Sequence, residues 1–343
     1  MPHMLCRFVL VSIVWTVAGC TASATLSPAD VAVPASPWPD YSFLELRNEH
    51  VALLVMEPDE AHGFNRASRF DRSGMVVLAQ TAEGHRFFGP VRDPEGHDPA
   101  RDDHVAGTAE EFDMQAPPGY DAAAAGEGFV KIGVGVLQRT DEEDYFFRED
   151  YPMLDPGRWR IEREADQVVF THDLEGPGGY AYRYTKQVRL LAEQAGFVIT
   201  RTLANTGERV IRTRHYGHHF VRIDGAAPGP GYTLSFGFDA EPGEGWRDEG
   251  RAVWRDGTLA ITEPVAGGSI WGPVVGYDPA QPAHHAVTVR HAAGGSVTFE
   301  GDRGLDELVF YSGGEAVCPE PFVALTIEPG ERERWRTTYT FGE

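Results

Sequence analysis

Thr213-Arg-His-Tyr-Gly-His-His-Phe-Val-Arg-Ile-Asp224 is the stretch from which the fold can be worked out. It sits in a longer segment, residues 210–223, that is rich in β-branched and aromatic residues, as strands are. Side chains alternate between the two faces of a strand, so His215 and His219 share one face with mostly apolar neighbours. Tyr216 and His218 lie on the other, more polar and aromatic face. We predict an interior β-strand here.

Similar short segments continue along the chain, separated by Gly, Pro, Asn and Asp, which are typical of turns between strands. Candidate strands cover residues 41–56, 75–79, 130–137, 168–172, 180–191, 197–203, 210–223, 232–238, 285–291, 296–300, 307–311, 323–327 and 334–341. No long stretch has helical periodicity and no repeat has a fixed period. We therefore predict an all-β domain of large antiparallel sheets, a β-sandwich over residues 40–343.

One hairpin can be read locally. Residues 180–191 alternate strictly, and a short loop at residues 193–196 leads into the next candidate strand. Lys186 falls on the same face as Tyr182 and Tyr184. Its stem could pack on the tyrosine rings, or its ammonium could donate to sugar hydroxyls in a cleft.

The composition favours a globular protein and disfavours nucleic acid as a partner. Hydrophobic residues make up 42% of the 343 residues, and the formal net charge is -22. Such a charge repels phosphate backbones, and no Lys/Arg stripe offsets it. Neutral or cationic ligands fit such a charge better, and we expect a monomer.

The N-terminus has the layout of an export signal. Residues 1–20 contain Arg7, an apolar run and small residues before Cys20. The run Val17-Ala18-Gly19-Cys20 resembles a bacterial lipobox, which implies that Cys20 carries lipid and that residues 21–39 form a flexible tether. We expect an exported protein, periplasmic or on the cell surface, attached to the membrane through that lipid only.

The polar face of the 210–223 strand suits a carbohydrate cleft, because aromatic rings stack on sugars while polar groups bind hydroxyls. Tyr216 and His218 are the candidates on this face, and the alternative is an ordinary surface histidine. His215, His218 and His219 could instead bind a metal ion. They cannot converge without a bulge, so no metal site is predicted.

Three further stretches carry candidate site residues. Pro319 and Pro321 flank Glu320 and fix the backbone, so Glu320 is presented rigidly at the start of a strand; the alternative is a simple loop glutamate. Arg69 and Asp71 lie in a run too charged for a core, which could bind substrate hydroxyls or form a surface network. Glu110, Glu111 and His219 complete the substrate-binding candidates. Residues 110 and 111 are placed in a loop, where paired acids could divide acid and base roles.

Together these stretches resemble the aldose 1-epimerase, or galactose mutarotase-like, superfamily. The C-terminal part is most specific. Residues 317–321, then residues 325–331 and finally residues 339–341 are similar to the family's Cys-Leu-Glu, Leu-x-Pro-Gly-Glu and Tyr-x-Phe motifs. The resemblance implies a β-supersandwich that binds a small sugar or oligosaccharide and needs no metal or organic cofactor.

By the same resemblance Glu320 is the general base, His218 the general acid and Arg69 the substrate-binding arginine. Where the family carries a His-Gly-Gly loop, this chain has residues 106–112, which end in two carboxylates and a phenylalanine. The leading hypothesis is therefore an enzyme that interconverts sugar anomers by ring opening outside the cytoplasm. A lyase or glycoside-cleaving enzyme on the same fold, and a non-catalytic sugar-binding lipoprotein, remain alternatives.

Overall fold

The computed structural model describes residues 30–113 and 115–343. The predicted signal segment and its lipidation site, Cys20, lie outside the described residues. Within the described ranges, no helix has the length and apolar character needed to cross a membrane.

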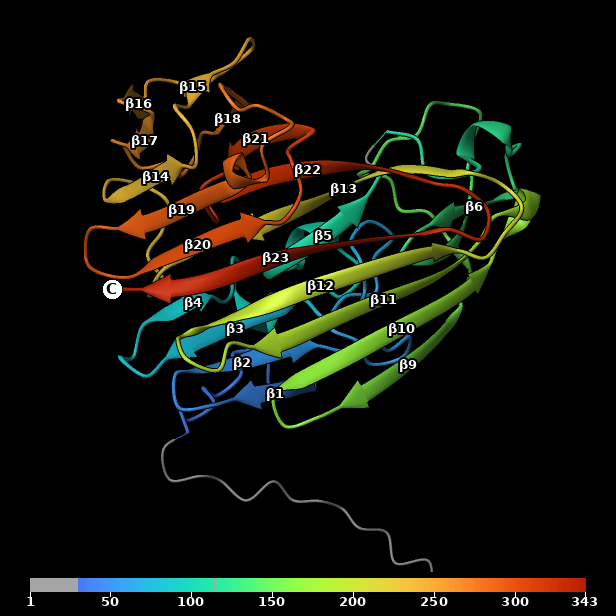
Figure 1. Cartoon of the computed structure of the whole chain (residues 1–343), viewed down its shortest axis with the longest axis horizontal. Coiled ribbons are helices and arrows are strands. Elements are labelled where there is room, and N and C mark those ends of the chain that lie inside the picture. Colours follow the sequence, from blue (N-terminus) through green and yellow to red (C-terminus); the bar gives the residue numbers. More distant parts are fainter. Residues whose placement is uncertain (1–29, 114) are drawn as a thin grey trace, which may run out of the picture.

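Two large antiparallel sheets dominate the described chain (Figure 1). In spatial order the ten-stranded sheet consists of β16 (Ala252–Arg255), β17 (Thr258–Ile261), β14 (Tyr232–Phe236), β19 (Ala286–His291), β20 (Ser296–Gly301), β23 (Arg332–Gly342), β12 (Gly196–Asn205), β11 (Ala181–Leu190), β10 (Gln167–Glu175) and β9 (Arg158–Arg163). The six-stranded sheet consists of β15 (Glu241–Pro242), β18 (Ile270–Val275), β21 (Glu307–Ser312), β22 (Cys318–Ile327), β13 (Ile211–Phe220) and β5 (Gly107–Phe112).

Two smaller sheets and five short 3-10 turns complete the architecture of residues 30–113 and 115–343. One small sheet contains β1 (Phe43–Arg47), β2 (Val51–Met56), β3 (Val76–Thr81) and β4 (Arg86–Phe88), and the other contains β6 (Gly128–Lys131), β7 (Gly135–Gln138) and β8 (Met153–Asp155). The turns are η1 (Pro94–Gly96), η2 (Asp102–His104), η3 (Tyr120–Ala122), η4 (Pro177–Gly179) and η5 (Pro282–His284). The predicted all-β fold class is confirmed.

The two large sheets pack face to face around the main core. His219 on β13 stacks on Phe299 of β20, with ring centroids 4.3 Å apart. Below them in Figure 1, the β1–β4 sheet covers one end of the sandwich, where Phe87 stacks on Phe341 at 4.4 Å. Burying these apolar faces is the main favourable contribution to folding.

The predicted hairpin is confirmed, with β11 and β12 antiparallel over their length. Buried side chains alternate along β11, and Lys186 lies on the buried face with Tyr182 and Tyr184. The predicted strand 41–56 is instead two strands. Asn48 divides it, because its side-chain oxygen accepts hydrogen bonds from the backbone N–H groups of His50 at 2.9 Å and Val51 at 3.0 Å.

The predicted loop around Glu110 and Glu111 is wrong, because these residues belong to β5, every residue of which is buried. Both faces of β5 are covered, so the period-two alternation that would mark a strand is absent. Gly107 opens this strand with φ +72°, and a Cβ there would overlap the carbonyl oxygen of Val76. A side chain at residue 107 would therefore push β5 away from β3.

The packed domain also begins earlier than the predicted residue 40. Trp38 is buried, with its ring centroid 4.8 Å from that of Phe64. Val31 is buried as well, and its N–H donates to the Asn48 carbonyl at 2.8 Å. The segment from Val31 to Trp38, predicted as tether, is thus part of the packed structure, since a buried indole removes a large apolar area from water.

Candidate active site

The two faces of β13 carry different chemistry, as the alternation predicted. His215 and His219 point into the sandwich, where His215 Nε2 lies 3.3 Å from Glu110 Oε2 and His219 Nε2 lies 3.0 Å from the Tyr339 hydroxyl. His218 is on the opposite face and lines a cleft. Among the described residues no group of three or more His, Cys, Asp or Glu side chains is placed to hold a metal ion.

Glu320 and His218 meet in the wall of this cleft. The Glu320 carboxyl oxygen Oε1 lies 3.1 Å from His218 Nε2, and both side chains are largely buried. The sequence indicated that Glu320 would lie at the start of a strand. In the structure it lies inside β22. The two residues are in direct contact, so a sugar cannot occupy the space between them and would have to lie against both.

The pairing of β13 with β22 places the Glu320 carboxyl group next to His218. β13 and β22 pair from Ile211↔Ile327 to Tyr216↔Phe322, and the isolated bridge Val221↔Val317 keeps the same register. That register sets His218 opposite Glu320. Pro319 and Pro321 have no N–H to donate at this point of the ladder, and the Pro319 carbonyl instead pairs with His219 Nδ1 at 2.9 Å.

Burial favours the uncharged forms of both groups. It raises the pKa of Glu320 to about 8, against a smaller lowering effect of Arg69. It also lowers the pKa of His218 well below its ordinary value, and the positive charge of Arg69 adds to this. His218 Nδ1 is buried without a hydrogen-bond partner, which further disfavours an imidazolium. At neutral pH burial therefore favours a protonated Glu320 carboxyl beside a neutral His218 imidazole, so the pair has one transferable proton, on Glu320.

The cleft has a volume of about 750 Å³, large enough for a sugar. Its lining comes from segments far apart in the chain: Arg69, Val91, Arg92, Arg101, Asp102, Asp103, Phe147, Arg148, Asp150, His218, Phe220, Arg247, Ser269, Trp271, Tyr311, Glu315, Ala316, Cys318 and Glu320. Arg69, His218 and Glu320, three residues nominated from the sequence, thus line one cavity.

Arg69 is held rigidly at the edge of the pair. Its guanidinium lies between the rings of Phe70, at 4.4 Å, and Phe147, at 4.3 Å. Its Nε donates to Glu111 Oε2 at 2.8 Å, and one Nη donates to the Tyr216 hydroxyl at 2.8 Å. Glu111 and Tyr216 are thus positioning residues behind Arg69, not part of the cleft lining as predicted.

A buried lysine completes this support. Lys131 Nζ donates to Glu111 Oε1 at 2.8 Å and to the Tyr145 hydroxyl at 3.0 Å. Burial opposes ionisation of Glu111, but Lys131 and then Arg69 outweigh it and hold the pKa of Glu111 below its ordinary value. The sequence reading missed Lys131, although a lysine between Val130 and Ile132 indicates a buried cation that requires a carboxylate partner.

Asp102 is a second cleft carboxyl that the sequence reading missed. It begins η2, and its Oδ1 accepts a hydrogen bond from the Arg69 backbone N–H at 3.3 Å. Burial raises the pKa of Asp102 to about 7, against the lowering effect of Arg69. Burial thus raises the pKa of both cleft carboxyls, Glu320 and Asp102, toward neutral pH.

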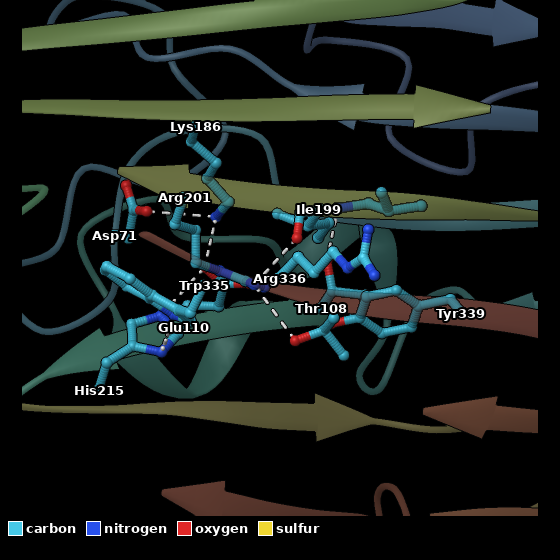
Figure 2. Close-up of polar contacts among 12 residues, drawn as sticks. Asp71, Thr108, Glu110, Lys186, Ile199, Arg201, His215, Trp335, Arg336 and Tyr339 are labelled. Atoms are coloured by element: carbon cyan, nitrogen blue, oxygen red, sulfur yellow. Dashed lines mark hydrogen bonds and ion pairs between the residues drawn. The ribbon is translucent and has the colours of Figure 1, made fainter. Parts of the chain in front are cut away.

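Three of the remaining candidates, Asp71, Glu110 and Lys186, belong to a separate network in the sandwich interior (Figure 2). Arg201 donates two hydrogen bonds to the Glu110 carboxylate, Lys186 Nζ lies 3.0 Å from Glu110 Oε2, and Lys186 also pairs with Asp71 at 3.2 Å. Burial opposes ionisation of Glu110, but Arg201 and then Lys186 lower its pKa well below the ordinary value.

The prediction that Asp71, Glu110, Lys186 and His219 bind substrate is therefore corrected. All four are almost fully buried and lie on the interior side of the six-stranded sheet, away from the cleft lining. The polar atoms of the network bind one another, as buried charges must. Sequence alternation separated the two faces of β13 but could not show that the second large sheet covers one of them.

The comparisons with known proteins bear on the fold. No protein-family model matches the chain, and no curated protein matches it. A solved structure of a protein from Synechocystis sp. PCC 6803 superposes with a TM-score of 0.55 at 12% identity, over 93% of this chain and 99% of that chain.

Two further similar structures are those of galactose mutarotase-like proteins. A galactose mutarotase-like protein from Clostridium acetobutylicum gives a TM-score of 0.54 at 11% identity, over 89% of this chain and 96% of that chain. A galactose mutarotase-like protein from Lactobacillus casei ATCC 334 gives 0.52 at 13% identity, over 88% of this chain and all (100%) of that chain. At such identities the likeness concerns the fold alone, and the fold is a galactose mutarotase-like β-supersandwich.

Proposed function

We propose that this protein is an aldose 1-epimerase-like enzyme that interconverts sugar anomers by general acid/base ring opening. The observation that carries the proposal is the contact of 3.1 Å between Glu320 and His218 in the wall of a sugar-sized cleft. Anomer interconversion needs one proton acceptor and one proton donor close together, because the C1 hydroxyl and the ring oxygen are bonded to the same carbon.

The proposed reaction leaves the proton count of the pair unchanged. One member accepts the proton of the C1 hydroxyl while the other donates a proton to the ring oxygen. The C1–ring oxygen bond breaks, which gives an open-chain aldehyde and a free hydroxyl. After rotation about C1–C2 the same transfers run in reverse on the other face of the aldehyde.

The position of the shared proton assigns the starting roles. The resemblance implies that Glu320 is the base and His218 the acid. In the structure burial favours a protonated carboxyl and a neutral imidazole. We therefore propose that Glu320 donates first and His218 accepts first, and that the roles exchange when the ring closes. Arg69, aimed at the same wall, would bind a substrate hydroxyl through its free Nη.

The shared proton predicts a pH dependence. Activity should fall as the pH rises through about 8, because Glu320 then loses the proton that the pair needs. On the acid side it should persist to well below the ordinary histidine range, because the pKa of His218 is lowered. The test is kcat/KM for anomer exchange from pH 4 to 10, after subtraction of the spontaneous rate. A catalysed rate that still rises above pH 9 would argue against a shared proton.

The two alternative functions agree less well with the positions of their candidate residues in the structure. A lyase or glycoside-cleaving enzyme would need Glu110, Glu111, Tyr216 or Lys186 to act beside His218. Glu110 and Lys186 are enclosed in the interior network, while Glu111 and Tyr216 lie behind Arg69. A purely sugar-binding lipoprotein does not need two buried, directly paired titratable groups in its cleft.

We also propose that the enzyme acts outside the cytoplasm as a lipid-anchored protein, on the strength of the residues preceding Cys20. Expression in a bacterial host with a fatty-acid label should give a labelled, membrane-associated protein. Cys20→Ser should lose both the label and the membrane association. Equal labelling of Cys20→Ser and wild type would contradict the anchor.

A further inference from the structure

The cleft is rich in arginine although the chain is strongly acidic. The whole chain has 52 Asp and Glu against 30 Lys and Arg, yet five arginines line this one cavity: Arg69, Arg92, Arg101, Arg148 and Arg247. The lining also holds five acidic residues, Asp102, Asp103, Asp150, Glu315 and Glu320. Burial favours the uncharged form of two of them, because it raises the pKa of Glu320 to about 8 and that of Asp102 to about 7. Near neutral pH the cleft is therefore more positive than its residue count indicates.

Two of these arginines have no carboxylate partner within residues 30–113 and 115–343. Arg69 pairs with Glu111, and Arg92 and Arg101 both pair with Asp103. Neither Arg148 nor Arg247 makes an ion pair or a side-chain hydrogen bond there; instead each guanidinium lies near an aromatic ring of the lining. A guanidinium with free N–H groups in a cavity is suited to bind an anionic group bidentately.

Arg247 belongs to a rigid part of the wall. Its backbone exchanges two hydrogen bonds of 2.8 Å with Trp271 on β18, and its guanidinium carbon is 5.8 Å from the Trp271 ring centroid. Trp271 is 41% exposed, which is unusual for a large aromatic side chain. An exposed indole in a polar cavity offers a flat apolar surface for the face of a sugar ring, next to a free guanidinium.

Arg148 lies in another segment, between β7 and β8, and its positive charge acts on His218 of the Glu320–His218 pair. Its guanidinium carbon is 5.4 Å from the ring centroid of Phe147, the same ring that packs on Arg69. After burial, Arg69 and His219, its charge contributes to the low pKa of His218. Arg148 and Arg247 thus extend the positive region from Arg69 toward Trp271.

We propose that the cleft takes an acidic carbohydrate, whose carboxylate or sulfate group is bound by Arg148 and Arg247 while a sugar ring packs on Trp271. The positive cleft would attract such an anion against the repulsion of the rest of the protein. A neutral sugar needs hydrogen bonds but no unpaired guanidinium. This inference rests on the proposed function for the assignment of the cleft as a sugar site, and it adds the charge of the substrate.

The test compares two matched pairs of sugars, galactose with galacturonate and glucose with glucuronate, by NMR titration of the full-length protein. At least one acid should bind about tenfold more tightly than its neutral partner, and added salt should weaken that preference. The double variant Arg148→Gln/Arg247→Gln should remove the preference. Arg290→Gln, at an exposed position of β19 outside the cleft lining, should keep it. Galactose 6-sulfate, added as a third arm, distinguishes a carboxylate from a sulfate as the preferred group.

The outcomes separate the two proposals. If neither an acid nor the sulfate is preferred, or if the double variant weakens neutral and acidic sugars equally, the inference about charge is overturned. If an acidic sugar is preferred but its anomers exchange no faster with the protein than without it, the charge inference stands and the proposed epimerase activity fails.

Discussion

We expect Glu320→Gln to lower kcat/KM for anomer interconversion by about 10²- to 10⁴-fold, the range that general acid/base catalysis typically contributes. The amide has nearly the shape of the carboxyl group and can still lie next to His218. It cannot, however, exchange a proton with the imidazole or the substrate. The pair would then lack the one titratable proton that both transfer steps require.

The same variant should be at least as stable as wild type in alkaline solution. The pKa of Glu320 is about 8 in the folded chain and 4.5 for a free carboxyl, so the folded state binds more protons between these values. The stability contributed by protonated Glu320 is complete below the unfolded pKa and is lost as the pH rises through the folded pKa. Gln avoids the buried charge that wild type acquires above about pH 8.

Polarimetry on a freshly dissolved anomer measures the activity of the variant. Circular dichroism checks its folding and follows its stability in alkaline solution. Glu331→Gln is a suitable control, because this glutamate is exposed in the turn between β22 and β23 and does not line the cleft. A folded Glu320→Gln variant with wild-type activity would remove Glu320 from the chemistry.

The second large effect concerns stability rather than activity. Glu110→Gln should destabilise the protein by about 3–5 kcal/mol, the usual effect of removing one member of a buried ion pair. Glu110 is fully buried, and its carboxylate neutralises Arg201 and Lys186 together. The substitution leaves Arg201 without a carboxylate partner among the described residues and leaves Lys186 paired only with Asp71.

Urea denaturation gives the free energy of unfolding for this variant. Glu333→Gln provides a matched comparison, because Glu333 pairs with Arg303 near the surface and such pairs contribute about 0–1 kcal/mol. A loss below about 1 kcal/mol for Glu110→Gln would show that the interior network is not a major contribution to stability.

Much of the fold could be predicted because most strands have one polar and one apolar face. β11 and β12 show this alternation, and their hairpin loop is short, so their pairing followed from the sequence. β5 could not be predicted in the same way. It is buried on both faces, and its two glutamates look solvent-exposed until Arg201, Arg69 and Lys131 are brought beside them by other strands.

The candidate site was predictable where neighbouring residues fix the geometry. The alternation of β13 separated His218 from His215 and His219, and the prolines around Glu320 indicated a constrained carboxyl group. The sequence could not show that the second large sheet covers the interior face of β13, so Lys186 and Glu110 were assigned to the cleft. It also did not indicate Asp102 or Arg247, because isolated charged residues in loops are common and usually solvated.

The most direct test of the central claim is two-dimensional exchange NMR of the anomeric protons of aldoses and acidic sugars with the wild-type protein at neutral pH. We predict exchange cross peaks between the α and β anomers of at least one sugar, with a rate proportional to protein concentration and abolished in Glu320→Gln. Exchange no faster than the spontaneous rate for every sugar, or enhancement that persists unchanged in Glu320→Gln, would contradict the assignment of the Glu320–His218 pair as the catalytic centre.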